Sequence, residues 1–185
     1  MMGMTGCRVG EMLGLKMGDL DFNRKVIYIR RSIDSRTKQE QSTKSKNSTG
    51  EVPMPTALEK RLRVFLKTEY RENPHRYVFA NRNGSPYSGG KVTEYGLWPV
   101  QDQLGIPHTG THAFRHAAAS ELLEEGAPLT VVQRQLRHRD AKTTLQKYGH
   151  VVGDSQRRAI NTLAEKIESH GVELESTAEL ESTRS

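Results

Sequence analysis

The sequence has a single cysteine, Cys7, among 185 residues. One thiol cannot form an internal disulfide, and it leaves no cysteine-rich zinc site. No run of about 18 apolar residues occurs, as a membrane-spanning helix would need. The first residues also lack the basic and then apolar pattern of a signal peptide. These absences predict a cytoplasmic protein with no disulfide framework and no membrane partner.

Charge is unevenly distributed along a chain of otherwise ordinary composition. Hydrophobic residues make up 34% and charged residues 27%, which at this length predicts one globular domain. The net charge is +6, but the segment 169–185 holds four glutamates and one arginine, so the residues before it carry +9. A basic body predicts a polyanionic partner, most often nucleic acid, although many basic proteins only have solvated lysines.

The hydrophobic pattern predicts a mainly helical protein with a small antiparallel sheet. Residues 25–33 alternate in the manner of a strand, 35–50 are polar as in an exposed hairpin loop, and 51–54 form the return strand. Helices are expected within 1–18, from Thr56, and over 91–104, 112–125, 129–136, 142–149 and 154–167. The acidic segment 169–185 is expected to be disordered.

Two of these helices carry end signals, and another has a one-sided apolar face. Thr56 followed by Glu59 predicts a capping box, and Gly126 predicts the C-terminal end of helix 112–125. The last helix has an apolar stripe of Ile160, Leu163, Ala164 and Ile167. That stripe could pack within its own domain or against a second copy of the chain.

The most informative polar cluster is His112-Ala-Phe-Arg115-His116. Positions i, i+3 and i+4 share a helix face, so the two histidines and the arginine could meet one ligand. A guanidinium group is a planar fork of donors that suits phosphate oxygens. The histidine spacing, with His108 four residues earlier, also fits a helical metal pair, but no glutamate or cysteine is placed to complete a zinc site. We therefore expect no metal.

Five short motifs follow one another in a recognisable order. Thr5-Gly6-Cys7-Arg8-Val9-Gly10-Glu11 comes first and is followed by Asp19 or Asp21. The others are Thr43-Lys44-Ser45-Lys46 before a Val-Pro strand, His112-x-x-Arg115-His116, Leu136-Arg137-His138 and Lys147-Tyr148-Gly149-His150. This series, from about Thr5 to Val152, resembles the signature boxes of the tyrosine recombinase (phage integrase) family.

The resemblance implies a fold, a domain plan and an activity. The fold is an α+β, mainly helical catalytic domain with a small antiparallel β-sheet on one edge. Residues 1–168 correspond to that domain, truncated at its N-terminus and without the family's core-binding domain, and 169–185 form an acidic tail. The implied function is site-specific recombination of DNA through a 3′-phosphotyrosyl intermediate, in integration or excision of a mobile element.

The resemblance also implies catalytic roles. Arg8 and Arg115 would clamp the scissile phosphate and stabilise the charge of the transition state. Tyr148 would attack phosphorus and release a 5′-hydroxyl. Lys44 on the hairpin would protonate the leaving oxygen, with Lys46 and Lys38 as nearby alternatives.

Two histidines complete the implied set. His112 would help to remove the phenolic proton of the nucleophile, because a phenol is mostly protonated at neutral pH. His138 would donate a hydrogen bond to a phosphate oxygen. No cofactor, metal or small-molecule substrate is implied. ATP is not needed because the covalent intermediate conserves the phosphoester energy, and a metal is not needed because two arginines already neutralise the phosphate. The expected partners are double-stranded DNA and, in a full-length protein, four protomers on DNA at the nucleoid.

Other interpretations of the same residues remain open. A nicking-closing enzyme like a type IB topoisomerase uses a similar constellation, and a DNA-binding module or inactive remnant would bind sites without chemistry. Arg8 could simply form an ion pair with Glu11, which would orient a neighbour rather than act as an acid. His116 is expected to be buried. Basic residues that could contact DNA or lie on a solvated face are Arg134, Arg137 and Arg139.

Overall fold

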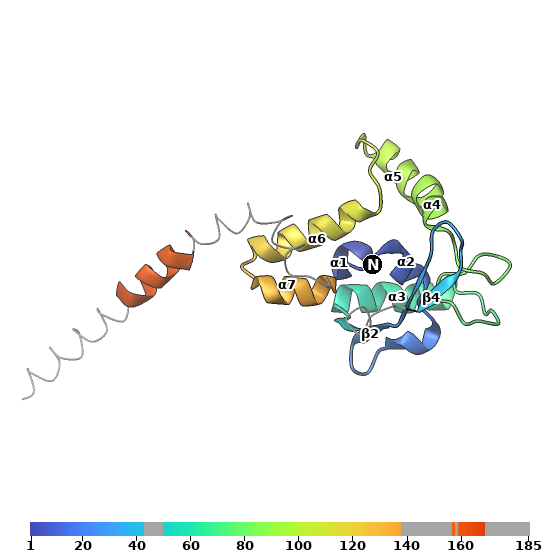
Figure 1. Ribbon diagram of the computed structural model, residues 1–185, viewed down its shortest axis with the longest axis horizontal. Coiled ribbons are helices and arrows are strands. Elements are labelled where there is room, and N and C mark those ends of the chain that lie inside the picture. Colours follow the sequence, from blue (N-terminus) through green and yellow to red (C-terminus); the bar gives the residue numbers. More distant parts are fainter. Residues whose placement is uncertain (43–49, 138–156, 158, 169–185) are drawn as a thin grey trace, which may run out of the picture.

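The computed structural model describes residues 1–42, 50–137, 157 and 159–168. Helices dominate this part of the chain, and a small sheet lies beside them (Figure 1). The helical elements are α1 Met2–Thr5, α2 Val9–Leu13, the 3-10 helix η1 Met17–Asp19, α3 Thr56–Thr68, α4 Gly89–Lys91, the π-helix η2 Val92–Leu97, α5 Trp98–Gln103, α6 His112–Glu124 and α7 Leu129–Leu136. Residues 159–168 are also helical.

The strands form two antiparallel sheets. They are β1 Leu20–Asp21, β2 Val26–Ile29, β3 Arg31–Ile33, β4 Glu40–Ser42 and β5 Gly50–Pro53. One sheet has the order β1-β2-β5, with Ile27 opposite both Leu20 and Val52, and the other pairs β3 with β4. The expected strand at 25–33 is therefore divided at Arg30, because its two halves pair with different partners.

Strand β4 lies where a loop was expected, and its contacts explain the difference. The Glu40 carboxylate accepts hydrogen bonds from Lys16 Nζ at 2.9 Å and from the Tyr77 hydroxyl at 2.7 Å. It also pairs with Arg31 at 3.4 Å. Because polar contacts rather than apolar burial tie this strand down, it has no hydrophobic alternation to reveal it.

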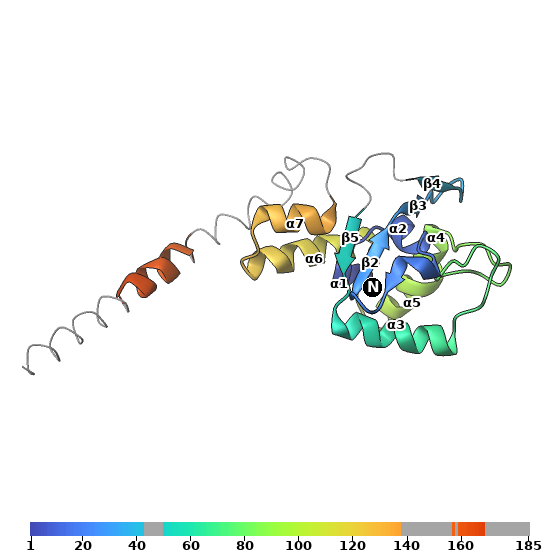
Figure 2. The same ribbon diagram turned by 90° about the horizontal axis from the view of Figure 1, so that it is seen from below.

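The larger core lies between the three-stranded sheet and α3, which runs along the sheet in Figure 2. Ile27, Ile29 and Val52 from the sheet pack with Leu58 and Leu62 of α3. These two leucines, one turn apart, form the buried face of α3.

The predicted capping box of α3 is wrong. Pro55 is the N-cap residue and no side chain caps the helix, so Thr56 already lies inside it. Proline presets the backbone for a helix start and needs no donor there. The Glu59 carboxylate instead accepts a hydrogen bond from Arg63 Nε at 3.0 Å and pairs with Lys25 at 3.6 Å.

A second core joins α6 to α7, which lie side by side in both ribbon views (Figures 1 and 2). Its buried residues are Ala119, Leu123, Val132 and Leu136. Val131 of α7 lies outside this core and is 49% exposed. Gly126 follows α6 with φ +82, a left-handed conformation that glycine adopts without strain. The two helices thus end and begin where the sequence predicted.

Residues 89–103 form one helical run, although it contains Gly96 and Pro99, two residue types that disfavour the interior of a helix. α4, η2 and α5 follow one another directly, and Pro99 lies in the first turn of α5. Proline has no N–H to donate, and the helix accommodates it with a π-helical segment immediately before.

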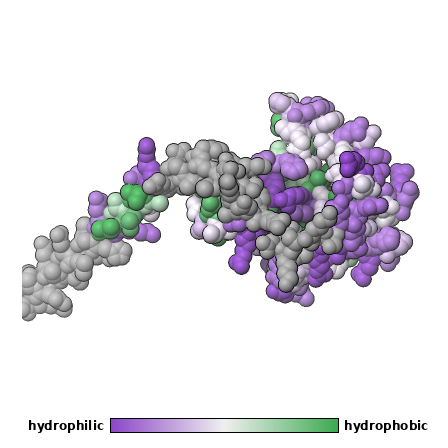
Figure 3. Space-filling model, viewed as in Figure 1, coloured by the Kyte–Doolittle hydropathy of each residue, from purple (hydrophilic) through white to green (hydrophobic). Residues whose placement is uncertain are grey.

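The helical segment 159–168 presents apolar side chains to solvent. Its exposed hydrophobic residues are Ile160, Leu163 and Ile167. Figure 3 shows hydrophobic surface, in green, on this segment. Among the described residues, no helix has the length and apolar character needed to cross a membrane.

Candidate active site

Arg115 joins three segments that are distant in sequence. It projects from α6, and only 5% of its surface is exposed. Its Nη1 donates a hydrogen bond to the Gly6 carbonyl oxygen at 2.5 Å, and its Nη2 donates to the carbonyl oxygen of Leu136 at the end of α7. The two carbonyls fix the plane of the guanidinium group. The second motif is therefore held against the first motif and against the segment that leads to His138.

Gly6 makes this close approach possible. It ends α1 with φ +67, and a Cβ atom there would lie 2.6 Å from Leu136 Cδ2. Any other residue would have both an unfavourable backbone and a clash with the second core. The turn at Gly6 places Arg8 two residues later as the N-cap of α2.

Arg8 and Glu11 form the ion pair that the sequence suggested. Arg8 Nη1 donates to Glu11 Oε1 at 2.9 Å, and the backbone N–H of Arg8 donates to Glu11 Oε2 at 2.7 Å. The Glu11 side chain is 3% exposed, whereas that of Arg8 is 42% exposed. The carboxylate is therefore a buried anchor, and the guanidinium group it holds reaches the surface, where an anion could meet it.

Arg137 also binds Glu11, which the sequence did not reveal. Its Nη2 donates to Glu11 Oε2 at 2.6 Å, and its Nη1 donates to the carbonyl oxygen of Gln135 at 3.1 Å. Arg137 is 7% exposed, so the expectation of a DNA-contacting or solvated surface residue is wrong for it. Arg134, one turn earlier on α7, is exposed. A local motif could not indicate which of two neighbouring arginines turns inward.

The cluster of Arg8, Glu11, Arg115 and Arg137 combines three cations with one carboxylate. Burial raises the pKa of the Glu11 carboxyl, but the charge of Arg137, followed by the hydrogen bond and charge of Arg8, outweighs burial and brings it below its ordinary value. Glu11 is thus an ionised partner at neutral pH rather than a proton donor. The cluster keeps a net positive charge, which suits a phosphate.

Cys7 lies beside this cluster but is not prepared for reaction. The residue is buried, and burial raises the pKa of its thiol above the ordinary value. Its backbone N–H donates to Thr5 Oγ1 at 3.3 Å. The thiol therefore contributes to packing.

The two histidines of the second motif are exposed, whereas its arginine is buried. His112 is the first residue of α6 and is exposed, one turn before the buried Arg115. His116 is exposed as well, so its expected burial is wrong. His108 pairs with Asp102 at 2.8 Å and stacks on Trp98. Within the described ranges, no three histidine, cysteine or acidic side chains are grouped to hold a metal ion.

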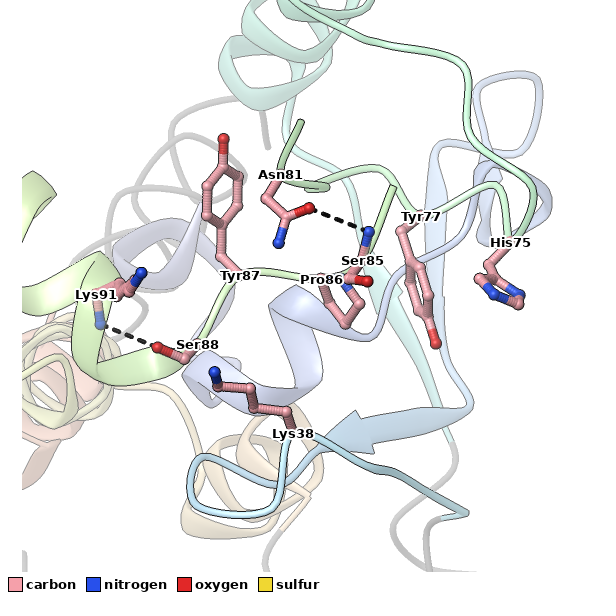
Figure 4. Close-up of a pocket in the computed structure, with 9 residues that line it drawn as sticks. All are labelled: Lys38, His75, Tyr77, Asn81, Ser85, Pro86, Tyr87, Ser88 and Lys91. Carbon is pink, nitrogen blue, oxygen red and sulfur yellow. Dashed lines mark hydrogen bonds between the residues drawn. The ribbon is translucent and has the colours of Figure 1, made fainter. Parts of the chain in front are cut away.

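A separate polar cavity of about 450 Å³ lies beyond the β3–β4 turn (Figure 4). Its lining residues are Lys38, His75, Tyr77, Asn81, Ser85, Pro86, Tyr87, Ser88 and Lys91. Lys38 extends from the turn toward Ser88 and has φ +57. Of the predicted catalytic residues that the structure describes, Arg8, His112 and Arg115, none lines the cavity. Lys38 thus lines this cavity and is not part of the arginine cluster.

Five residues with a role predicted from the sequence lie outside the described part of the chain. They are Lys44, its alternative Lys46, His138, Tyr148 and the possible DNA contact Arg139. The described geometry therefore concerns Arg8, Arg115 and His112. It brings the segments that carry the two arginines together through the Gly6 carbonyl, and it places His112 at the exposed start of the same helix as Arg115.

Comparison with known proteins gives one consistent family. The profile of the phage integrase family matches residues 1–153. A tyrosine recombinase XerC-like protein of Caldanaerobacter subterraneus subsp. tengcongensis is 30% identical over 181 residues, covering 86% of this chain and 46% of the relative. The integrase of Staphylococcus phage L54a is 28% identical over 182 residues, covering 89% and 49%. The chain spans about half the length of these relatives.

Solved structures support the same fold. The Tn1549 transposon integrase in complex with circular intermediate DNA superposes with a TM-score of 0.74 and 22% identity, over 88% of this chain and 57% of that one. The crystal structure of XerA recombinase gives a TM-score of 0.69 and 23% identity, over 87% and 53%. These likenesses confirm the expected mainly helical α+β fold with its small antiparallel sheet.

Proposed function

Because the chain belongs to the phage integrase family, we propose that it is the catalytic domain of a site-specific DNA recombinase. The enzyme cuts and rejoins double-stranded DNA through a 3′-phosphotyrosyl intermediate, in integration or excision of a mobile element. The observation that carries the proposal is the arginine cluster, in which Arg115 is fixed against the segment that presents Arg8. Two guanidinium groups from distant motifs match the two oxygens of a phosphodiester.

The proposed reaction exchanges one phosphoester for another. The Tyr148 oxygen attacks the scissile phosphorus, and the bond from phosphorus to the 5′-oxygen breaks. His112 accepts the phenolic proton, and the Lys44 ammonium protonates the departing 5′-oxygen. Attack by a 5′-hydroxyl of the partner strand reverses these steps. Because each step conserves one phosphoester bond, no ATP is consumed.

The remaining residues stabilise the pentavalent transition state. Arg8 and Arg115 neutralise the charge that develops on the nonbridging oxygens, and His138 donates a further hydrogen bond. The carbonyl bonds of Arg115 hold its guanidinium before substrate arrives, so no reorganisation is needed at the moment of reaction. With this much fixed positive charge at the phosphate, the mechanism needs no metal ion.

A nicked suicide duplex tests the proposal, because loss of the short fragment traps the covalent adduct. We expect a protein–DNA adduct with the wild type and none with Tyr148→Phe. Tyr95→Phe, which removes the hydroxyl of an exposed tyrosine on η2, is the matched control and should form the adduct normally. Absence of an adduct from a wild-type protein that still binds the duplex would favour a DNA-binding module instead.

Dependence on DNA sequence separates recombination from a topoisomerase-like activity. A recombinase should form the adduct on its own site far faster than on unrelated duplexes, whereas a nicking-closing enzyme should relax any supercoiled plasmid. With DNA as substrate, we place the enzyme in the cytoplasm, associated with the nucleoid.

We further propose that four protomers act together on two duplexes. The exposed apolar side chains Ile160, Leu163 and Ile167 on the helical segment 159–168 favour such an assembly, because they form a stripe that a neighbouring copy could cover. Deleting residues 154–185 should reduce the number of protomers in the protein–DNA complex, as obtained from its mass in analytical ultracentrifugation. An unchanged number of protomers would contradict this role.

A further inference from the structure

Arg137 occupies a backbone conformation that arginine does not favour. It ends α7 with φ +53, at a C-terminal helix position where glycine is common. Among the described residues, the other non-glycine residues with positive φ are Lys25, Lys38 and Arg76, and all three are exposed. Arg137 is buried. A buried side chain that persists in a strained position must gain from its contacts, and its charged contact is Glu11.

The Glu11 carboxylate divides its two oxygens between two arginines. Oε1 accepts from Arg8, and Oε2 accepts from Arg137. If Arg8 were the sole partner of Glu11, the buried carboxylate would cancel the charge of Arg8. The pair would then carry no net charge to attract a phosphate. With Arg137 present, the three side chains together carry one positive charge. Arg8 is the exposed member of the three. The net positive charge therefore lies at the surface, where DNA would bind.

The surroundings of Arg137 also hold it in place. The carbonyl of Leu136, directly before it, accepts a hydrogen bond from Arg115. A Cβ atom on Gly50 would lie 3.3 Å from Arg137 Cδ, so strand β5 closes over the side chain. Among the described residues, Arg137 Nε has no hydrogen-bond partner, and the guanidinium is held through its Nη1 and Nη2 atoms.

We propose that Arg137 is a positioning residue that neutralises Glu11 and so leaves the charge of Arg8 available to the DNA phosphate. This inference rests on the proposed recombinase function. Arg137 touches neither DNA nor the nucleophile in this role. It acts through Glu11 on Arg8, and its removal should resemble a partial loss of Arg8 charge.

The test measures two properties of the full chain. One is the affinity for a 30-base-pair duplex by fluorescence anisotropy, and the other is the rate of adduct formation on the suicide duplex. Arg137→Gly should lower both at least tenfold. Arg76→Gly is the matched control, because it also replaces an arginine at positive φ with glycine, but at an exposed position without a carboxylate partner. It should change both by less than threefold.

A charge-balanced double variant distinguishes this role from a merely structural one. Adding Glu11→Gln to Arg137→Gly removes the carboxylate that would otherwise cancel Arg8, while the amide oxygen can still accept from the Arg8 N–H. We expect the double variant to recover adduct formation to within about threefold of the wild type. Equal or lower activity than Arg137→Gly alone would overturn the inference, because a lost packing contact is not restored by a second substitution.

A second pair of variants covers the case in which Arg137→Gly fails to fold. Arg137→Lys keeps the cation, and Arg137→Met keeps much of the length without charge. The lysine variant should retain most of the adduct rate and the methionine variant should not; equal rates would contradict the inference.

A wild-type protein that neither binds nor cleaves DNA would overturn the proposed function together with this inference. An active wild type with Arg137→Gly indistinguishable from Arg76→Gly would overturn the inference alone.

Discussion

Arg115 Nη1 and the Gly6 carbonyl oxygen, 109 positions apart in the chain, are joined by a hydrogen bond of 2.5 Å. This bond connects the helix of the second motif to the turn of the first. The Arg115 guanidinium also binds the Leu136 carbonyl oxygen. This one buried side chain therefore contributes both to the stability of the fold and to the geometry of the site.

Replacing Arg115 should therefore destabilise the fold as well as abolish cleavage. Arg115→Leu leaves two buried carbonyl oxygens without this donor, and such losses cost about 1–3 kcal/mol each. We expect the free energy of unfolding, measured by urea denaturation, to fall by roughly 2–6 kcal/mol. Arg134→Leu, at an exposed arginine on α7, should change it by no more than about 0.5 kcal/mol. Equal stability of the two variants would contradict the anchoring role of Arg115.

Gly6 should be much less tolerant of alanine than a glycine of similar conformation elsewhere. Gly105 has φ +63 and nothing within 4 Å of a Cβ atom, so Gly105→Ala should cost about 1 kcal/mol from backbone strain alone. Gly6→Ala adds a clash with Leu136 at 2.6 Å, and overpacking costs roughly 1–3 kcal/mol more. Thermal unfolding of both variants measures the difference. Similar melting temperatures would show that the Gly6 turn is not held against the second core.

Glu11 should contribute a pH-dependent part of the stability. The charges of Arg137 and Arg8 outweigh burial and hold the pKa of its carboxyl below the ordinary 4.5. A lowered folded pKa gives stability that is present above about pH 4.5 and is lost as the pH falls through the folded value.

The Glu11→Gln variant isolates that contribution. It should lose roughly 3–5 kcal/mol at neutral pH, because Arg137 then remains buried without its charged partner. Its free energy of unfolding should also fall less steeply than that of the wild type below pH 4.5. Urea denaturation from pH 3 to pH 7 measures both effects, with Glu94→Gln at an exposed position of η2 as the control. Parallel pH profiles for the wild type and Glu11→Gln would argue against an ionised Glu11.

Tyr77 should make the stability of the fold depend on pH in the alkaline range. Burial, followed by the hydrogen bond to Glu40, raises the pKa of its phenol to about 12. A raised folded pKa gives stability that is complete below the unfolded value of 10 and is lost as the pH rises through the folded one. Tyr77→Phe should remove this loss between pH 10 and 12, whereas Tyr95→Phe, at an exposed tyrosine, should retain it. Ultraviolet titration and urea denaturation together test the expectation.

Much of the secondary structure could be predicted because its signals are local. Helix α7 has the bounds that its apolar spacing indicated, and Gly126 marks the turn before it. Strand β5 begins one residue before the expected return strand. The start of α3 at Thr56 was predicted, but strand β4 and the N-cap of α3 were missed, because ion pairs of Glu40 and the backbone of Pro55 decide them, and neither leaves a periodic pattern.

The family, the order of the motifs and the identities of the arginines can all be read from the amino-acid sequence, because these features lie in short contiguous patterns. The tertiary structure alone decided which of those arginines are buried and what each one binds. Arg134 and Arg137 are the same residue type, three positions apart. Arg134 is exposed, whereas Arg137 binds the carboxylate of Glu11, 126 positions away in the chain. That choice depends on how α7 packs against the turn at Gly6, and such long-range packing leaves no trace in local spacing.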